Sequence, residues 1–588
     1  MSTTHYYLKA QCIALIILYY IPNSILFAQS DPIQKPNVIL ILVDDMSLMD
    51  LGSYGGEAST PHLDQLAHSG IRFFNHHTSP SCAPSRAMLL TGMDSHKTGV
   101  PNLPLFLPPE QINEVGYEGI LNDTVKTLGT LLKAEGYNTY VSGKWHMGHS
   151  PNTLPTKRGF DRSYILDASG ADNYEHKAYL PTQSKPPWYQ DGKEIDLPED
   201  FYSSRTLVDK LISFIDEEED KASPFFSYLA FQAIHIPVQA PKEFIANYDG
   251  VYDKGWDVIR QERYEKAIEL GIIDSSVQLG EMLPFLNSWE SQTEEEKQLK
   301  AKAMAVNAAM IEAMDFHIGR LMDYLEEQGK LNNTVFLVSS DNGPEGSDPS
   351  LVAGMDLWLQ WAGYDREYDN LGQRGSWNFI GPEFASAAAS PSAYFKFYAG
   401  EGGLRVPLIV SGAGLAFRKT KSAFSFVTDV VPTILDIVGA SYPQNYFDGK
   451  SLYPLIQNTQ ERIHEEDEYV AVEVAGNAAL FKGNMKIVRN GPIYGDNKWY
   501  MYDISSDPGE TQDLSQKMPE LFEEMMEYYR EYCEEYGVLE MPEGYSQTGE
   551  IKRKFIDNVK QKSMPWIIGI LILLGVIVFY KLGRKIEA

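Results

Sequence analysis

Apolar runs alternate with amphipathic stretches along the first three-quarters of the chain. Four of these runs have no polar face, which is typical of strands buried on both sides of a parallel sheet; they lie at residues 36–43, 225–230, 334–339 and 406–410. Apolar residues at helical spacing predict helices between them, at residues 124–135, 203–218, 294–328 and 427–438. Strands alternating with helices predict an α/β fold, with a large central sheet that is mixed but mainly parallel and is flanked by helices.

The pattern changes after residue 440. Short alternating runs predict a smaller antiparallel sheet at residues 469–473, 485–488 and 498–503, with an acidic helix packed beside it at 519–535. We therefore predict a catalytic domain over 36–440, a C-terminal subdomain over 441–545 and a polar, basic linker over 546–563. The acidic insertion at 240–300 has no pattern that assigns a structure.

Both ends of the chain carry apolar runs outside these domains. Residues 1–28 place an apolar core behind Lys9, which predicts a signal peptide; the alternative, a short membrane anchor, is less favoured because the core is shorter than the ~20 residues of a span. The charge-free run in 564–581 predicts a transmembrane anchor before a cytoplasmic tail, 582–588. This layout predicts an exported protein, membrane-anchored by one C-terminal span with its catalytic domain on the periplasmic or extracellular side.

The charge of the chain argues against one class of binding partner, nucleic acids. The chain has 588 residues, with 50 Lys and Arg against 80 Asp and Glu, and a formal net charge of −30. An acidic surface repels phosphate backbones, which argues against nucleic-acid binding. With three cysteines in the whole chain, no disulfide framework is expected.

Pairs of oxygen-bearing side chains follow two of the predicted strands. Asp44 and Asp45 come directly after one, and Asp341 and Asn342 after another. Ligands of open α/β sheets bind at the carboxyl ends of strands, and so many anionic oxygens together require a hard cation such as Ca²⁺ or Mg²⁺ rather than Zn²⁺. Each pair alone is more simply a cap or a turn; together, the two interpretations stand about even.

A third feature is Cys82, at the predicted start of a helix. Pro84 suits the first helical position and Gly92 suits the C-terminal stop. The free N–H groups of a helix N-terminus favour an anion, and Arg86 one turn further on can point to the same place. The alternative for a lone cysteine is a small buried apolar residue.

These residues carry a resemblance. Cys82-Ala-Pro-Ser-Arg86 with Leu90-Thr-Gly92 matches the Cys-x-Pro-Ser-Arg signature of the sulfatase family, and residues 136–146 resemble its second signature. Residues 498–510 are similar to a segment near the family's C-terminus, so the resemblance covers roughly residues 36–540. Residues 381–384, Lys396 and residues 401–407 resemble the bacterial arylsulfatase branch most closely.

The resemblance implies an alkaline-phosphatase-like fold and hydrolysis of sulfate monoesters to an alcohol or phenol and inorganic sulfate. A formylglycine-generating enzyme would oxidise Cys82 to formylglycine, whose hydrate offers one hydroxyl to attack sulfur and a second to expel sulfate. The implied cation ligands are Asp44, Asp45, Asp341, Asn342 and the modified Cys82. The cation would be Ca²⁺, with Mg²⁺ possible.

The remaining roles are also implied by the resemblance. Arg86 and Lys144 would hold the formylglycine and the sulfate oxygens. His146 would be the base of the elimination step, and Asp341 would also accept the nucleophile's proton. His235 and Lys396 would bind sulfate and assist the departing oxygen. Taken singly, each of these residues has a structural explanation as a helix-end cation or a buried, hydrogen-bonded histidine.

Three questions stay open at this point. The substrate, a small molecule or a carbohydrate, is an aryl or a sugar sulfate. Aromatic residues between Asn342 and Lys396 either line the substrate site or pack on themselves; they are Trp358, Trp361, Tyr364, Tyr368, Trp377, Phe379, Phe384 and Tyr394. The competing functions are a phosphonate monoester or phosphodiester hydrolase on the same scaffold, and an inactive, membrane-tethered binding protein.

Overall fold

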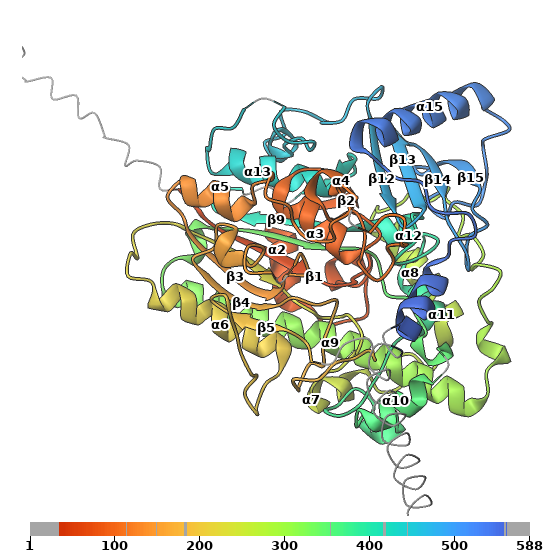
Figure 1. Cartoon of the computed structure of the whole chain (residues 1–588), viewed down its shortest axis with the longest axis horizontal. Helices are drawn as coiled ribbons and strands as arrows, with labels where there is room; N and C mark the ends of the chain where they lie inside the picture. The colour runs from red at the N-terminus through yellow and green to blue at the C-terminus, as the bar shows by residue number, and fades with distance from the viewer. Residues whose placement is uncertain are drawn as a thin grey trace, which may run out of the picture. The chain divides into compact units, whose positions relative to one another are not determined.

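The four apolar runs form neighbouring strands of one sheet (Figure 1). The computed structural model describes residues 35–560, apart from 113, 149, 182–184, 353, 416–418, 444 and 558–559. The chain divides into Met1–Pro36 and Asn37–Ala588, and the description below concerns the second unit. The predicted signal peptide, the C-terminal run and the tail lie outside the described residues.

The large sheet has eleven strands in the order β10-β2-β9-β8-β1-β7-β3-β4-β5-β6, with β11 paired to β2. Its core pairs, β8 with β1, β1 with β7, β7 with β3 and β3 with β4, are parallel, whereas β9 runs antiparallel to both of its neighbours. This confirms a mixed, mainly parallel sheet. The strands are β1 (Asn37–Val43), β2 (Ile71–His77), β3 (Asn138–Lys144), β4 (Arg162–Leu166), β5 (Trp188–Gln190), β6 (Lys193–Glu194), β7 (Phe225–Ala230), β8 (Thr334–Ser340), β9 (Arg405–Gly412), β10 (Lys419–Lys421) and β11 (Ser425–Phe426).

Helices cover both faces of this sheet. In β1, Ile39 and Ile41 pack into one core with α2, α6 and α9, whereas Val38 and Leu40 pack into a second core with α3, α5 and α13. Burial on both faces explains why the strand sequence has no polar side. The helices are α2 (Pro61–Ser69), α3 (Cys82–Thr91), α4 (Ser95–Thr98), α5 (Leu128–Ala134), α6 (Ser203–Glu217), α7 (Lys242–Ile245), α8 (Gly255–Glu269), α9 (Glu294–Glu327), α10 (Met355–Trp361), α11 (Gly381–Ala388), α12 (Glu401–Leu404), α13 (Val430–Ile437), α14 (Tyr453–Ile456) and α15 (Pro519–Tyr536).

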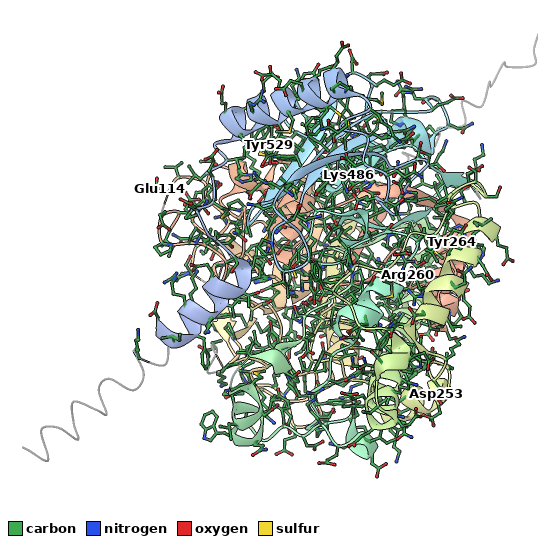
Figure 2. The ribbon with its side chains drawn as sticks, turned by 90° about the vertical axis from the view of Figure 1, so that its right-hand side faces the viewer. Glu114, Asp253, Arg260, Tyr264, Lys486 and Tyr529 are labelled. Carbon is green, nitrogen blue, oxygen red and sulfur yellow. The ribbon has the colours of Figure 1, made fainter. Side chains whose placement is uncertain are left out.

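The smaller antiparallel sheet follows, in the order β12 (Tyr469–Val474), β13 (Asn477–Lys482), β14 (Met485–Arg489) and β15 (Trp499–Asp503). Helix α15 lies along it, with Met525 and Tyr529 buried against Leu480 and Ile487 (Figures 1 and 2). The sequence pattern predicted three of these strands and the helix; β13 was missing. The boundaries at 440 and 545 stay a prediction.

A buried charge cluster joins the small sheet to the large one. The Nζ atom of Lys486 on β14 lies 2.9 Å from Glu401 Oε1 and 2.7 Å from Glu510 Oε1, and Glu401 Oε2 lies 3.0 Å from Nε2 of His77 on β2 (Figure 2 labels Lys486). All four side chains are almost fully buried. Because Glu401 begins α12, this cluster also fixes the end of the loop that carries Lys396.

The insertion at 240–300 proves to be partly helical. It contains α7 and α8, and α8 is tied to the following segment by Arg260 Nη1, which donates to Gly280 O at 2.8 Å, and by Tyr264 Oη, which donates to Val277 O at 2.6 Å (Figure 2). The amphipathic signal of α8 is weak because its buried face includes Arg260 and Arg263. Apolar periodicity therefore could not reveal it.

The predicted location of the chain is corrected. None of the helices over the described residues combines the length and the apolar character needed to cross a bilayer. This finding contradicts the prediction of an exported, membrane-anchored protein, and we withdraw it. The runs at 1–28 and 564–581, on which it rested, lie outside the described residues.

Candidate active site

The two acidic strand ends lie next to each other. Strands β1 and β8 pair in parallel with Val43 opposite Ser340, so the residues that follow them emerge at the same edge of the sheet. The backbone N–H of Asp45 donates to Asp341 Oδ1 at 3.1 Å, and Asn342 Nδ2 donates to Asp45 Oδ1 at 2.7 Å. The parallel register therefore brings together the two acidic pairs, as their positions at the carboxyl ends of two strands predicted.

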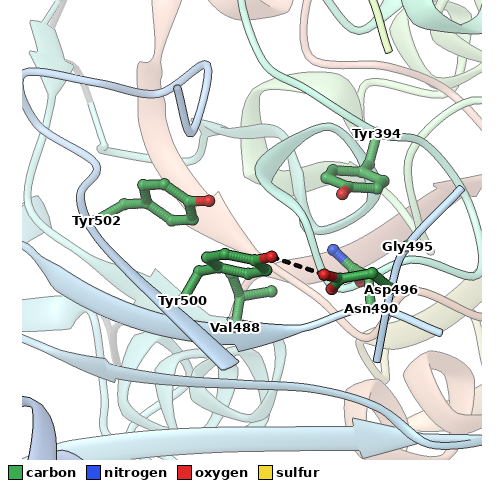
Figure 3. A pocket seen from close by; sticks show the side chains of 7 residues that line it. All are labelled: Tyr394, Val488, Asn490, Gly495, Asp496, Tyr500 and Tyr502. Atoms are coloured by element: carbon green, nitrogen blue, oxygen red, sulfur yellow. Dashed lines mark hydrogen bonds between the residues drawn. The ribbon is translucent and has the colours of Figure 1, made fainter. Parts of the chain in front are cut away.

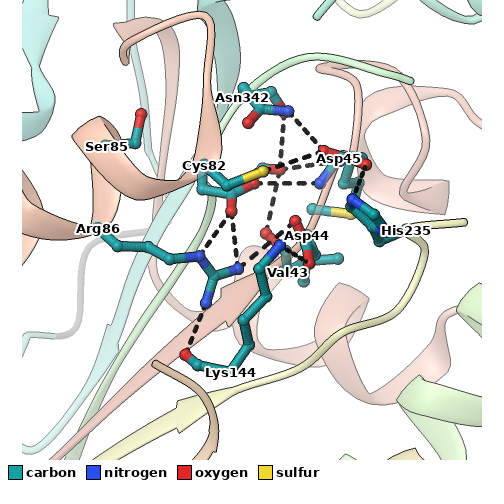
Figure 4. A network of polar contacts seen from close by, with 12 residues as sticks. Val43, Asp44, Asp45, Cys82, Ser85, Arg86, Lys144, His235 and Asn342 are labelled. Carbon is teal, nitrogen blue, oxygen red and sulfur yellow. Dashed lines mark hydrogen bonds and ion pairs between the residues drawn. The ribbon is translucent and has the colours of Figure 1, made fainter. Parts of the chain in front are cut away.

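Cys82 faces this cluster from the start of α3. The helix begins at Cys82 itself after Ser81, and Gly92 ends it with a left-handed φ of 69°. Pro84 is its third residue rather than its first; it is tolerated there because the N–H groups of a first helical turn have no partner within the helix. The Cys82 Sγ atom lies 3.9 Å from Asp45 Oδ1 (Figure 4).

Arg86, one turn along α3, reaches the same carboxylates. Its Nε and Nη2 atoms lie 2.8 and 2.7 Å from Asp341 Oδ2, and Nη2 lies 3.6 Å from Asp44 Oδ1. Its Nη1 atom donates to the carbonyl of Lys144 at 2.8 Å (Figure 4). The guanidinium therefore fixes the residue that follows β8 relative to the last residue of β3.

Two lysines complete the positive charge. Lys144, the last residue of β3, places Nζ 2.6 Å from Asp44 Oδ2. Lys396, in the loop between α11 and α12, places Nζ 2.7 and 2.8 Å from the two carboxylate oxygens of Asp45. All four side chains are buried, so these attractions act with little solvent screening.

Two histidines border the cluster. His235 follows β7; its Nε2 atom lies 3.9 Å from Asp45 Oδ2 and its Nδ1 atom 2.6 Å from Ile236 O. His146 lies two residues beyond β3, with Nδ1 buried and without a hydrogen-bond partner. Burial, reinforced by the positive charge of Lys144, holds the pKa of His146 well below its ordinary value of 6.5. His146 is therefore a neutral base at neutral pH.

The donor set fits a hard cation. One ligand atom from each of Asp44, Asp45, Cys82 and Asp341 lies within 4.8 Å of the others. Asp44 Oδ1 and Asn342 Oδ1 are buried acceptors without a hydrogen-bond partner, as oxygens available to a metal ion would be. Burial, followed by the charge of Asp341, raises the pKa of Asp44 well above its ordinary value. A bound cation would give these two oxygens a partner and would favour the ionised form of Asp44.

The same environment makes an unmodified Cys82 a poor nucleophile. Burial raises the pKa of its thiol well above 9.0, although Lys144 and Lys396 oppose the shift. The reactive form of cysteine is the thiolate, so a buried, protonated thiol has little reactivity. An unmodified thiol at this position is therefore protonated at neutral pH.

The comparisons with known proteins agree with the signatures. The family model described as Sulfatase matches residues 36–440. The chain belongs to the sulfatase family. An uncharacterized sulfatase of Schizosaccharomyces pombe is 35% identical over 536 residues, 87% of this chain and 96% of the relative. The arylsulfatase of Klebsiella aerogenes is 35% identical over 428 residues, 72% of this chain and 90% of the relative.

The fold comparison gives the same result. The crystal structure of Ps i-CgsB in complex with k-i-k-neocarrahexaose superposes with a TM-score of 0.61 at 25% identity, covering 90% of this chain and 99% of that one. The alkaline-phosphatase-like architecture is thus confirmed, and this sulfatase is a sulfuric ester hydrolase.

The structure adds a residue of this sulfatase that sequence reasoning missed. Glu345, in the loop after β8, has a buried side chain whose Oε2 atom lies 2.8 Å from Lys396 Nζ. The one feature of the sequence that could have indicated Glu345 is its position four residues after Asp341, at the end of the same strand. A single glutamate after Gly-Pro matches no motif that would predict a role. Its link to the site is the ion pair with Lys396, which is distant in the sequence and is brought close by the fold.

The aromatic residues after Asn342 lie in different surroundings. Trp377 is fully buried and donates from Nε1 to Tyr179 O at 3.2 Å, and the ring of Tyr179 meets His235 edge-on at 5.3 Å. Trp361, by contrast, is 84% exposed. Through Tyr179, Trp377 therefore supports the His235 loop.

A hollow lies between Tyr394, in the loop that carries Lys396, and the β14–β15 part of the small sheet. Its lining is mainly tyrosine and amide or carboxylate groups, with Tyr500 Oη donating to Asp496 Oδ2 at 2.7 Å (Figure 3). Its empty volume is about 240 Å³, open solvent at its mouth included. It is lined by Tyr394, Val488, Asn490, Gly495, Asp496, Tyr500 and Tyr502.

Several residues of the site have strained backbone conformations. Asp45 and His146 have left-handed φ values of 67° and 59°, and Tyr394 and Phe397, on either side of Lys396, have 66° and 73°. Such non-glycine conformations cost about 1–3 kcal/mol each and persist only where the surroundings enforce them. The fold therefore holds three of the site's loops in conformations that they would not adopt alone.

Proposed function

We propose that this sulfatase cleaves sulfate monoesters as an arylsulfatase-type enzyme, through a formylglycine that a separate modifying enzyme makes from Cys82. The observation that carries the proposal is the place of Cys82: a buried thiol 3.9 Å from Asp45 and surrounded by the buried cations Arg86, Lys144 and Lys396. No ordinary apolar cysteine has such surroundings. A group that repeatedly gains and loses negative charge needs them.

Asp44, Asp45, Asp341 and Asn342 would hold the divalent cation, together with the modified side chain at position 82. The oxygen-rich set supports Ca²⁺, with Mg²⁺ as the alternative. When present, the aldehyde hydrate supplies a hydroxyl nucleophile and a second hydroxyl for release of sulfate, and the cation withdraws electron density from the sulfate oxygens. The unpartnered oxygens of Asp44 and Asn342 support this assignment.

The other polar side chains would act on charge and protons. Asp341, whose Oδ2 atom is already held by Arg86, would accept the proton of the attacking hydroxyl. Arg86 and Lys144 would keep fixed positive charge beside the sulfate oxygens, where negative charge grows in the transition state. His146, neutral because burial lowers its pKa, would take the proton of the second hydroxyl. His235 and Lys396 would bind sulfate and assist the departing oxygen.

For the substrate we propose a sulfated carbohydrate or aromatic ring. The Klebsiella aerogenes relative is named an arylsulfatase, and the similar Ps i-CgsB was crystallised with k-i-k-neocarrahexaose. The tyrosine-lined hollow, to which Tyr394 of the Lys396 loop contributes, offers ring faces and hydrogen-bonding groups of the kind that hold sugars. We propose that residues 36–440 provide the chemistry and that 441–545, which line much of this hollow, help to select the substrate.

The decisive experiment combines mass spectrometry with paired kinetics. The chain is co-produced with a formylglycine-generating enzyme, and the mass of the proteolytic peptide that contains Cys82 is measured. We expect Cys82 to be converted to the aldehyde and Cys533 to be unmodified in the same sample. Rates are then measured on 4-nitrophenyl sulfate, phosphate and phenylphosphonate after chelation and after return of Ca²⁺ or Mg²⁺. Unconverted Cys82 in active protein, or faster turnover of the phosphorus esters, contradicts the proposal.

A further inference from the structure

Glu345 adds a negative charge to a site that must bind an anion. Its carboxylate is buried, with Oε1 accepting the N–H of Ser347 at 3.1 Å and Oε2 2.8 Å from Lys396 Nζ. The backbone holds the two segments together, because the N–H of Lys396 donates to Pro344 O at 3.0 Å. Glu345 is therefore a fixed part of the site.

Its neighbours place its charge close to the groups that would hold the ester. A carboxylate oxygen of Glu345, one of Asp45 and a ring nitrogen of His235 lie within 4.8 Å of one another. Lys396 thus contacts two carboxylates, that of Asp45 at the proposed cation site and that of Glu345. Much of the positive charge that Lys396 offers to a ligand is cancelled.

The charge balance of the site depends on this residue. The ion pairs described here contain four carboxylates, from Asp44, Asp45, Asp341 and Glu345, and three basic groups, from Arg86, Lys144 and Lys396. With the divalent cation of the proposed function, the site has one net positive charge. That charge balances a sulfate monoester, which is a monoanion. An aryl phosphate is mainly a dianion above pH 7, since its second pKa is about 6.

We propose that Glu345 is a specificity-determining residue that sets this site for monoanionic sulfate esters and against dianionic phosphate esters. The inference rests on the proposed function, because it counts the cation held by Asp44, Asp45, Asp341 and Asn342. Its basis is repulsion: a fixed charge in a desolvated site penalises a ligand with one extra negative charge more than it penalises a singly charged one.

Two substitutions separate charge from positioning. Glu345→Gln keeps an oxygen that can accept from Lys396 Nζ but removes the charge. Glu345→Ala removes both. The matched control is Glu383→Gln, a buried glutamate on α11 that lies 3.7 Å from Lys300 and belongs to no part of the site. All variants are prepared with the formylglycine-generating enzyme and with Ca²⁺ at pH 8.

The kinetic readout is the ratio of kcat/KM for 4-nitrophenyl phosphate to kcat/KM for 4-nitrophenyl sulfate. We expect Glu345→Gln to raise this ratio about tenfold or more, and Glu383→Gln to leave it unchanged. A ratio that stays constant in Glu345→Gln, or equal losses on both esters in Glu345→Gln and Glu345→Ala, overturns the inference and leaves Glu345 as a positioning residue for Lys396.

A binding readout does not depend on turnover. In a Cys82→Ala background, calorimetry with the same two esters gives their dissociation constants with and without Glu345→Gln. The phosphate-to-sulfate affinity ratio should rise about tenfold, as in the kinetics. If the parent chain hydrolyses neither ester, the proposed function fails, whereas the binding ratio still decides the role of Glu345.

Discussion

The buried Glu510 predicts an unusual dependence of stability on pH. Burial, partly opposed by Lys486 and reinforced by the charge of Glu401, raises the pKa of Glu510 from 4.5 to about 7. For Glu401, burial is outweighed by the attraction of Lys486 and of His77, which holds its pKa well below its ordinary value. Glu510 is the member of the pair that takes up a proton near neutrality.

The sign follows from proton linkage. Between pH 4.5 and 7 the folded chain holds a proton on Glu510 that the unfolded chain has already released, so raising the pH through this window destabilises the fold. A shift from 4.5 to about 7, at 1.36 kcal/mol per unit, corresponds to about 3 kcal/mol of stability lost by pH 8. Above pH 8 this contribution is constant.

Glu510→Gln should remove that loss. The amide cannot titrate, although one of the two donors that face Glu510, Lys486 Nζ at 2.7 Å and the N–H of Glu401 at 3.1 Å, then meets an NH₂ group and adds a constant penalty. Urea unfolding of both proteins at steps from pH 4.5 to 8 measures their difference. That difference should move by about 3 kcal/mol in favour of Glu510→Gln as the pH rises.

The control is Glu523→Gln, an exposed glutamate on α15 whose partner is Arg530. It should leave the pH profile of the wild type unchanged. A difference between Glu510→Gln and wild type that stays flat from pH 4.5 to 8, or one that moves in favour of the wild type, refutes the assignment of the proton to Glu510.

Further predictions concern the site and its scaffold. Cys82→Ser should retain its fold but accumulate one covalently bound sulfo group without turnover, visible by mass spectrometry, because serine has no second hydroxyl to expel sulfate. Lys396→Met should lower kcat/KM about 10²–10³-fold, as loss of a charge-stabilising donor does; an unchanged value would remove Lys396 from the site. Gly143→Ala should yield misfolded protein or a strongly lowered Tm, since its Cβ would lie 1.7 Å from Ala230 O between β3 and β7. A Gly143→Ala protein with wild-type Tm would contradict this packing. Chelation should lower Tm, and Ca²⁺ should restore it; a Tm indifferent to both would argue against the cation site.

Much of the fold could be read from periodicity. The expected helices over 203–218 and 294–328 correspond to α6 and α9 almost residue for residue, because both have long stretches with an apolar face and α9 opens with the Thr293 and Glu296 capping box. Strands β2 and β4 escaped notice. Both carry polar or charged residues, such as Arg72 and Arg162, so no apolar run marks them.

The candidate site was predictable for a different reason. Local sequence patterns indicated the chemistry of Cys82, Arg86 and the two acidic pairs. The structure brings all of these residues together. Lys144, His146, His235 and Lys396 were assigned by resemblance. The geometry places Lys144, His235 and Lys396 beside the same carboxylates, and His146 near Lys144 and Arg86. Their catalytic roles stay a prediction.

By itself, the sequence determined the α/β class, the strand ends that carry the acidic pairs and the helix that presents Cys82, since each depends on the spacing of residues close in the chain. Only the tertiary structure decided that Lys396 is shared between Asp45 and Glu345, and that Lys486 joins Glu401 to Glu510. The physical reason is the range of the interaction. Periodicity reflects burial of one segment against its surroundings. A buried charge is instead defined by partners tens to hundreds of residues away, whose positions depend on how the segments of the whole fold are arranged.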